Sequence, residues 1–193
     1  MRARRGRALH NRRVKRVAIV ATASGCGKTT FGRALASALG VPFVELDAIH
    51  WQAGWTGLDA AELRRRVGPL VERDAWVVDG SYSGKLGDLV LAPADTVVWL
   101  DLPRRVWLPR LARRTLRRAI LREELWNGNR ESLRGSFAHA DSVLRYALAN
   151  QAPRRHRYRR ELAGCRVARL RSPAEVEAFL RSVTPVGRTP SCR

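Results

Sequence analysis

Short apolar runs alternate along the chain with longer segments in which apolar residues return every three or four positions. The length of the short runs predicts buried strands, and the spacing in the longer segments predicts helices. The predicted strands are residues 14–21, 43–47, 76–79, 96–100 and 167–170, and the predicted helices are residues 28–39, 60–73, 104–125 and 173–180. Strands that alternate with helices are typical of a parallel sheet covered on both faces, which is the α/β class.

Several predicted helices begin or end at residues with capping chemistry. Gly40 and Pro42 follow the first predicted helix, as expected where a helix stops. Asp59 precedes the second helix and Ser172 the last, and each side chain can accept a hydrogen bond from a free backbone N–H. These residues support the predicted boundaries.

The stretch between the first strand and the first helix carries the clearest functional signal. Two glycines let backbone N–H groups turn inward, and the helix N-terminus adds a positive dipole end, so the loop suits a polyphosphate. Lys28 can reach the β- and γ-phosphates of a nucleotide, and the Thr29 hydroxyl can hold Mg²⁺. We therefore predict an ATP-binding loop made of Ser24, Gly25, Cys26, Gly27, Lys28, Thr29 and Thr30.

Two predicted strands end on an aspartate. Asp79 and Asp101 lie at the carboxyl edge, where open α/β sheets place their ligands. Either could hold Mg²⁺, which prefers one or two carboxylates together with phosphate oxygens. We prefer Asp79 as the partner of Thr29 at the metal, because Asp101 leads into the next helix and is an alternative cap for it. Asp47, which ends the second strand, is the candidate for taking a proton from the acceptor hydroxyl or for orienting it.

The predicted helix at residues 104–125 is rich in arginine. Five guanidinium groups share one face, and they repel each other unless an anion lies between them. We therefore predict that this face turns toward nucleotide phosphates, with Arg114 and Arg118 acting in catalysis; a solvated helix is the alternative. The five residues are Arg110, Arg113, Arg114, Arg117 and Arg118.

Composition narrows the class of protein. The 193 residues, 45% of them hydrophobic, suit one globular domain. No apolar run approaches the roughly 18 residues that a membrane-spanning helix needs. The three cysteines are irregularly spaced, which argues against a disulfide framework or a zinc site and favours a reducing cytoplasm.

The net charge of +20 raises the possibility of a nucleic-acid partner. Residues 1–13 contain arginines and no acid, so we predict a disordered basic arm there, and weak, non-specific nucleic-acid binding through it is an alternative role. No apolar segment follows the arm, which argues against a secretory signal and leaves an arginine-rich transit peptide as an alternative. Residues 14–183 are the predicted folded domain, and residues 184–193 are a predicted flexible tail.

With these motifs in this order along the sequence, the chain resembles the small P-loop kinases of the adenylate kinase, shikimate kinase and gluconate kinase type. Within that group the chain looks most like the adenylate-kinase-like proteins labelled DNA topology modulation proteins. The matching segments are residues 24–30, 45–51, 76–82, 101–103 and 124–131. The resemblance implies a three-layer P-loop NTPase fold with a five-stranded parallel sheet and an arginine-rich helical lid at about residues 104–134. It also implies that lid arginines close over the transferring phosphoryl group and that Asp79 assists Mg²⁺.

Two departures from the pattern of these kinases bear on the activity. Thr22 stands where G-x-x-x-x-G-K-[ST] has its first glycine, which can tighten or reshape the phosphate cradle. Adenylate kinases carry Asp-Gly-Phe-Pro-Arg where this chain has Asp-Gly-Ser-Tyr-Ser at residues 79–83. The arginine of that motif normally clamps the acceptor's phosphate, so its absence argues against AMP as the acceptor.

We therefore expect a kinase that uses ATP and Mg²⁺ and moves the γ-phosphoryl group in line to a nucleotide or small hydroxyl acceptor. The alternative is a nucleic-acid-associated ATP-binding protein with little kinase turnover.

Overall fold

A five-stranded sheet forms the centre of the computed structural model, which describes residues 14–130 and 143–183. Its strands are all parallel and lie in the order β2-β5-β1-β6-β7. The strands are β1 (Arg16–Ala21), β2 (Phe43–Glu45), β5 (Trp76–Asp79), β6 (Thr96–Leu100) and β7 (Val167–Leu170). The predicted α/β class with a five-stranded parallel sheet is confirmed.

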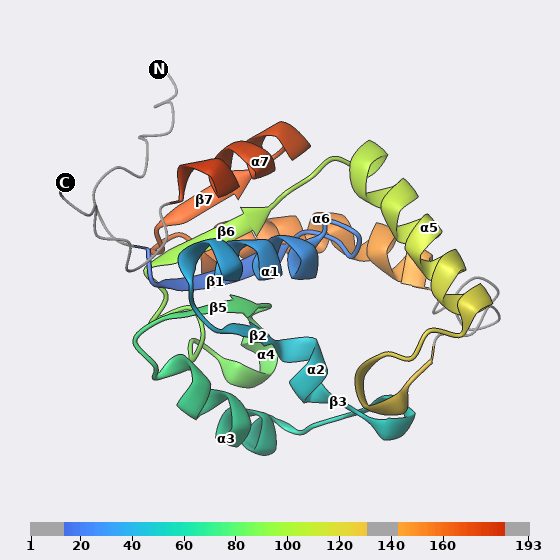
Figure 1. Ribbon diagram of the computed structural model, residues 1–193, viewed down its shortest axis with the longest axis horizontal. Coiled ribbons are helices and arrows are strands. Elements are labelled where there is room, and N and C mark those ends of the chain that lie inside the picture. The colour runs from blue at the N-terminus through green and yellow to red at the C-terminus, as the bar shows by residue number, and fades with distance from the viewer. Residues whose placement is uncertain (1–13, 131–142, 184–193) are drawn as a thin grey trace, which may run out of the picture.

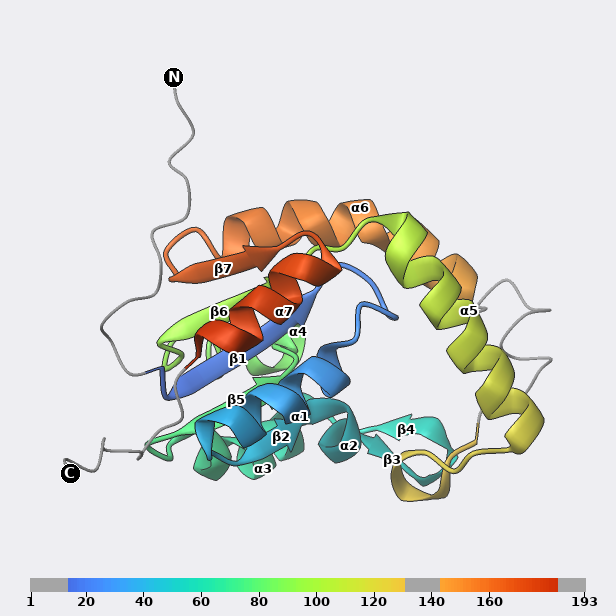
Figure 2. The same ribbon diagram turned by 45° about the horizontal axis from the view of Figure 1, so that its top comes forward.

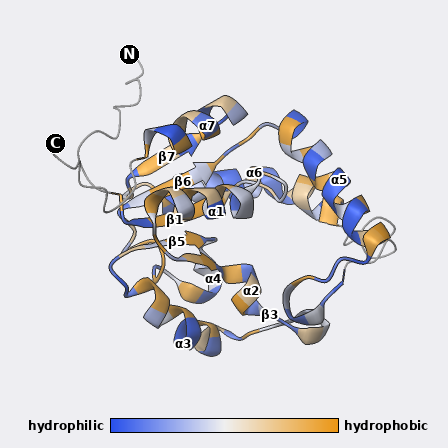
Figure 3. Cartoon of the chain, in the orientation of Figure 1, coloured by the Kyte–Doolittle hydropathy of each residue, from blue (hydrophilic) through white to orange (hydrophobic). Residues whose placement is uncertain are grey.

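The central strands are apolar along their whole length because helices cover both faces of the sheet. In β1, Val17 and Ile19 point to one face and Ala18 and Val20 to the other, and all four are buried. A parallel sheet with two covered faces requires such continuous apolar runs. Figure 3 shows this pattern as apolar colouring along the sheet.

Helices lie in a layer on each face of the sheet (Figures 1 and 2). The first layer holds α1 (Lys28–Leu39) and α7 (Pro173–Ser182), which contact each other. The second holds α3 (Ala60–Val71), the short α4 (Ser83–Leu86) and the end of α6 (Val143–Glu161). Among the described residues, no helix is both long and apolar enough to cross a lipid bilayer.

Helix α5 (Arg104–Leu121) stands away from the sheet and arches beyond its carboxyl edge (Figure 1). The first turns of α5 are anchored, because Trp107 and Leu111 are fully buried in the core. In the last turn Ala119 is still buried, but Ile120 and Leu121 are exposed. After α5 the chain returns to contact α2 and β3, the segment that follows β2, so this excursion of the chain is held at both ends.

Residues with capping chemistry lie where the sequence predicts helix ends. Asp59 accepts a hydrogen bond from the backbone N–H of Glu62, and Ser172 accepts one from that of Glu175. Gly40 takes the left-handed conformation that closes α1, with φ of +68°. These local predictions are confirmed.

Other predicted elements differ from the structure. The second strand ends at Glu45, and the next residues form the short helix α2 (Leu46–His50), so Asp47 lies on a helical turn and not on a strand. A small hairpin of β3 (Trp51–Gln52) and β4 (Thr56–Gly57) follows, where the spacing predicts no element.

The arginine-rich helix ends at Leu121 rather than near residue 125, and helix α6 has no predicted counterpart. Few residues of α6 are buried, so it lacks the apolar period from which helices are recognised. The predicted arm at residues 1–13, the tail at 184–193 and the end of the predicted lid lie outside the described residues.

Two helical glycines test this packing. A Cβ at Gly32 of α1 would lie 2.5 Å from Phe43 Cε2 and 3.0 Å from Ile19 Cδ1, whereas a Cβ at Gly68 of α3 meets nothing within 4 Å. We expect Gly32→Ala to destabilise the fold by about 1–3 kcal/mol through overpacking. Gly68→Ala should change the stability by less than about 1 kcal/mol, because the helix propensity of alanine is offset by the contact of its Cβ with the ring of Pro69, the next residue in α3. Urea unfolding measures both, and equal effects would contradict the described packing of α1 on the sheet.

Candidate active site

The loop between β1 and α1 leaves the sheet at its centre, since β1 lies between β5 and β6. Gly25 and Gly27 both have φ of +85°, the left-handed region that glycine adopts without strain. A Cβ at Gly25 would lie 2.6 Å from the carbonyl oxygen of Trp107, so α5 packs directly against the loop. Gly27 is the N-cap of α1, and Lys28 and Thr29 therefore begin that helix.

Lys28 and Thr29 both contact Asp79 at the end of β5. Lys28 Nζ lies 2.5 Å from Asp79 Oδ1, and Thr29 Oγ1 donates to Asp79 Oδ2 at 2.7 Å. The aspartate is only 2% exposed. Its place beside the loop follows from the parallel register of β1 and β5, in which Ile19 lies opposite Asp79. The structure thus brings together the three polar side chains that the sequence assigns to phosphate and metal.

The charges around Lys28 keep it protonated. Burial would lower the pKa of this ammonium group, but the negative charges of Asp79 and Asp47 raise the pKa above its ordinary value. The site therefore holds a fixed positive charge beneath the loop. Such a charge suits the stabilisation of phosphate oxygens.

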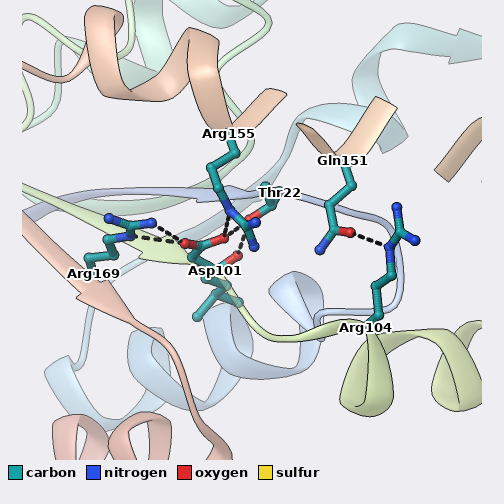
Figure 4. A network of polar contacts seen from close by, with 7 residues as sticks. Thr22, Asp101, Arg104, Gln151, Arg155 and Arg169 are labelled. Atoms are coloured by element: carbon teal, nitrogen blue, oxygen red, sulfur yellow. Dashed lines mark hydrogen bonds and ion pairs between the residues drawn. The ribbon is translucent and has the colours of Figure 1, made fainter. Parts of the chain in front are cut away.

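Asp101 lies on the other side of β1 and is held by three side chains (Figure 4). Thr22 Oγ1 donates to Asp101 Oδ1 at 2.7 Å and Arg155 Nε donates to the same oxygen at 2.8 Å. Arg169 donates to Oδ2 from Nε at 2.9 Å and from its terminal nitrogen. Burial would raise the pKa of Asp101, but the hydrogen bonds from Arg169, Thr22 and Arg155 hold it below its ordinary value.

These contacts correct one alternative for Asp101, the helix cap, and weigh against the other, the metal ligand. It does not cap α5, whose N-cap is Pro103, and its oxygens already accept from two guanidinium groups, which makes it a poor ligand for a metal ion. They also explain Thr22, because a glycine at this position could not bond Asp101. The threonine ties the start of the loop to the end of β6.

Asp47 lies on the first turn of α2 and is oriented by Tyr82. The Tyr82 hydroxyl donates to Asp47 Oδ1 at 2.5 Å. Burial and the charge of Asp47 raise the pKa of Tyr82, so the phenol stays a hydrogen-bond donor. His50 packs between the rings of Trp51 and Tyr82, with centroid separations of 4.8 and 4.9 Å, in agreement with a packing role. Burial lowers the pKa of His50.

An open cleft of about 360 Å³ lies between the loop helix and the far end of α5. Arg118 and Thr29 line it together, so a predicted lid arginine and the loop face the same space. The other lining residues are Arg33, Glu45, Glu124, Leu125 and Trp126.

The five arginines of α5 do not form one equivalent face. Arg114 and Arg118 are half-buried, whereas the other three are exposed. Arg117 pairs with Glu123 at 3.0 Å. The structure therefore separates the two arginines proposed for catalysis from Arg110, Arg113 and Arg117, which the spacing alone treats as equal.

Three residues of the site and one hairpin are missed from the sequence. Tyr82 is recognised as a site residue only from its hydrogen bond to Asp47. Arg155 and Arg169 are recognised only from their contacts with Asp101 in the folded chain. A hairpin at residues 124–130 had a readable signal, the Asn-Gly dipeptide at Asn127, which favours a tight hairpin turn.

Comparisons of the sequence and of the fold with known proteins find P-loop kinases. The family model of shikimate kinase matches residues 24–62, which contain the loop, α1, α2 and the β3–β4 hairpin. No curated protein sequence matches the chain.

Among solved structures, a shikimate kinase from Bacteroides thetaiotaomicron superposes with a TM-score of 0.52 at 14% identity, over 87% of this chain and 95% of that one. The chain has the fold of the small P-loop kinases. A shikimate kinase from Acinetobacter baumannii in complex with shikimate gives 0.52 at 18% identity, over 88% and 90% of the two chains. A gluconokinase from Sinorhizobium meliloti gives 0.50 at 21% identity, over 89% and 91%.

Removal of the Asp101 charge should weaken the fold in a pH-dependent way. We expect Asp101→Asn to cost about 2–3 kcal/mol, less than the 3–5 typical of a fully buried pair, because Arg155 and Arg169 can reach water. The lowered pKa means that the carboxylate stabilises the fold above its unfolded pKa of about 3.9 and loses this contribution as the pH falls through the folded value.

Chemical denaturation from pH 7 to pH 2.5 measures this difference. The difference in free energy of unfolding between the native chain and Asp101→Asn should be largest at neutral pH and should shrink below about pH 4. Asp74→Asn is the control, because Asp74 is fully exposed and lies 3.9 Å from Arg16. A gap that is independent of pH would contradict an ionic role for Asp101.

Proposed function

We propose that this protein is an ATP-dependent phosphotransferase that moves the γ-phosphoryl group to a small acceptor with a free hydroxyl group. The observation that carries the proposal is the convergence of Lys28 and Thr29 on buried Asp79, at 2.5 and 2.7 Å, beside a cleft that also contains Arg118. The kinase fold of the solved relatives and the family match at residues 24–62 support it.

The residues present fit a magnesium ion. Asp79 and Thr29 offer a carboxylate and a hydroxyl oxygen at one place, and Mg²⁺ prefers a few such oxygens completed by substrate phosphates and water. Among the described residues there is no cluster of three or more histidine, cysteine or acidic side chains that could hold a metal ion without a substrate. When bound, Mg²⁺ would neutralise charge on the phosphate oxygens.

In this proposal the chain acts by positioning and by charge. Lys28 leaves Asp79 for the β- and γ-phosphate oxygens, which the loop amides and the α1 N-terminus also attract. Arg118 supplies positive charge from the opposite wall of the cleft, with Arg114 one turn before it. Because Tyr82 holds Asp47 Oδ1, the second oxygen of Asp47 can accept the proton of the acceptor hydroxyl.

The acceptor is proposed to be a hydroxyl compound and not AMP. At residues 79–83 the chain lacks the arginine of adenylate kinases, and Tyr82 of this segment is engaged with Asp47. Two solved relatives are kinases of hydroxylated molecules by name, shikimate kinase and gluconokinase. The finer resemblance to DNA topology modulation proteins rests on residues 45–51 and 124–131.

Loss of the Lys28 charge should remove phosphoryl transfer. We expect Lys28→Met to lower turnover by about 10²–10³-fold, the usual effect of removing one group that stabilises transition-state charge. Lys15→Met is the control, because Lys15 is exposed and lies just before β1, at the end of that strand away from the loop. Circular dichroism verifies folding, and a coupled assay with a screened panel of hydroxyl compounds measures turnover. Turnover within about tenfold of the native enzyme would reject the loop as the catalytic cradle.

Asp79 and Asp47 should have separable roles. Asp79→Asn should weaken the Mg²⁺ dependence of ATP binding, because it removes the carboxylate beside Thr29. Asp47→Asn should leave Mg²⁺·ATP affinity nearly unchanged and lower transfer by about 10²–10⁴-fold, the range for a positioned base. Calorimetric titration of ATP with and without Mg²⁺ measures the first effect. If Asp47→Asn is the variant that loses Mg²⁺·ATP, the two roles are exchanged.

A further inference from the structure

The chain after α5 folds into a tight hairpin at residues 124–130. Glu124 pairs with Arg130 as an antiparallel bridge, and the Leu125 N–H donates to the Asn129 carbonyl at 2.7 Å. Asn127 and Gly128 have φ of +55° and +81°, as the two central residues of a type I′ turn require. This hairpin forms the tip of the segment that α5 begins.

A second hairpin, at residues 51–57, packs directly against it, and the ring centroids of Trp55 and Trp126 are 6.4 Å apart. It consists of β3 and β4, with Trp51 opposite Gly57 and Gln52 opposite Thr56. Its turn contains Gly54 and Trp55 at φ of +69° and +58°. Trp55 is thus a non-glycine residue in the left-handed region, a strained conformation that its surroundings must hold in place.

The two hairpins are joined by the side-chain amides of Asn127 and Asn129. Asn129 Oδ1 accepts from the Trp55 N–H at 2.8 Å, and its Nδ2 donates to the Gln52 carbonyl at 2.8 Å. Asn127 Nδ2 donates to the Trp51 carbonyl. Asn129 is 4% exposed, so its two hydrogen bonds are largely shielded from water, whereas the bond from Asn127 is exposed. We call this set of three hydrogen bonds the clasp.

The clasp links the two segments that carry the proposed acceptor and phosphate contacts. The 51–57 hairpin directly follows α2, which holds Asp47, and the 124–130 hairpin follows the end of α5, which holds Arg118. Trp126 strengthens the link, because its Nε1 donates to Glu45 Oε1 at 3.2 Å and both residues line the cleft. A shift of either segment is therefore transmitted to the other through these side-chain hydrogen bonds.

We propose that Asn127 and Asn129 are positioning residues that make the arginine-bearing arch and the Asp47 segment move as one body. When phosphates at the loop engage Arg118, the clasp brings Asp47 into place. Without the clasp, the α5 segment and the Asp47 segment respond to the nucleotide separately. The inference rests on the proposed function, since it takes the anion at Arg118 to be a nucleotide phosphate.

Hydrogen exchange measured by mass spectrometry tests the coupling without a known acceptor. The ligand is Mg²⁺ with a non-hydrolysable ATP analogue, and the readout is the change in exchange that it causes in peptides covering residues 22–30, 104–122 and 51–57. The change on ligand binding is used and not the basal rate, because a mere loss of stability speeds exchange in both states.

Two variants remove the clasp in different ways. Asn127→Gly keeps the left-handed turn and deletes only the donor to Trp51, and Asn129→Ala deletes the other two hydrogen bonds. The control is Asn150→Ala, because the Asn150 side chain donates only within its own helix, to the Tyr146 carbonyl at 2.9 Å. Asn127→Gly keeps the test valid if Asn129→Ala does not fold.

In the native protein we expect the analogue to slow exchange in all three segments. In the clasp variants the slowing at residues 22–30 should persist, while that at residues 51–57 should fall by roughly two- to tenfold per lost hydrogen bond. Asn150→Ala should behave as the native chain does.

The two possible failures are distinguishable. Slowing at residues 22–30 with an unresponsive 51–57 hairpin in the native protein, or an undiminished response in both variants, overturns the coupling alone. Absence of slowing at residues 22–30 in the native protein overturns the proposed nucleotide binding, and the coupling with it.

Discussion

Two buried carboxylates hold the loop after β1 from opposite sides, and the rest of the site depends on this arrangement. Asp79 at the end of β5 binds Lys28 and Thr29 at the end of the loop, and Asp101 after β6 binds Thr22 at its start. Both contacts exist because β1 lies between β5 and β6 in the sheet. The loop is therefore fixed at both ends, and its two left-handed glycines turn the chain between them into α1.

A buried carboxylate is costly unless its oxygens are paired and hydrogen-bonded. The two aspartates satisfy this condition in different ways. Asp101 is neutralised by Arg155 from α6 and Arg169 from β7, so it is a structural anion that ties the C-terminal part of the chain to the loop. Asp79 is neutralised by Lys28, a group that a nucleotide phosphate would also attract, so its pairing can change when a ligand binds.

Two segments extend beyond the carboxyl edge of the sheet, α5 with its tip and the hairpin that follows α2. Helix α5 packs on Gly25 through Trp107 at its start, and its tip is joined to the hairpin after α2 by Asn127 and Asn129. The cleft between α1 and the far end of α5 contains both arginine and acidic side chains. This connection between the two segments favours a concerted adjustment over free opening, because moving one segment alone would break the hydrogen bonds between them.

The sequence by itself determined the five strands of the central sheet, most helices and the loop, because their signals lie within a few neighbouring residues: apolar period, caps such as Asp59, and the spacing of Gly25, Gly27 and Lys28. It also indicated that Asp79 belongs beside the loop, since parallel strands bring their carboxyl ends to one edge. Helix α6 was not predictable in this way, because few of its residues are buried, and Asp47 was placed on a strand that ends two residues earlier.

Only the tertiary structure decided which groups neutralise each other. The partners of Asp101 are 54 and 68 positions away in the chain, and Tyr82 meets Asp47 across 35 positions. No local period encodes such pairs. They form because the strand order and the path of α6 bring distant side chains to one buried place, where an unpaired charge would be too costly to keep.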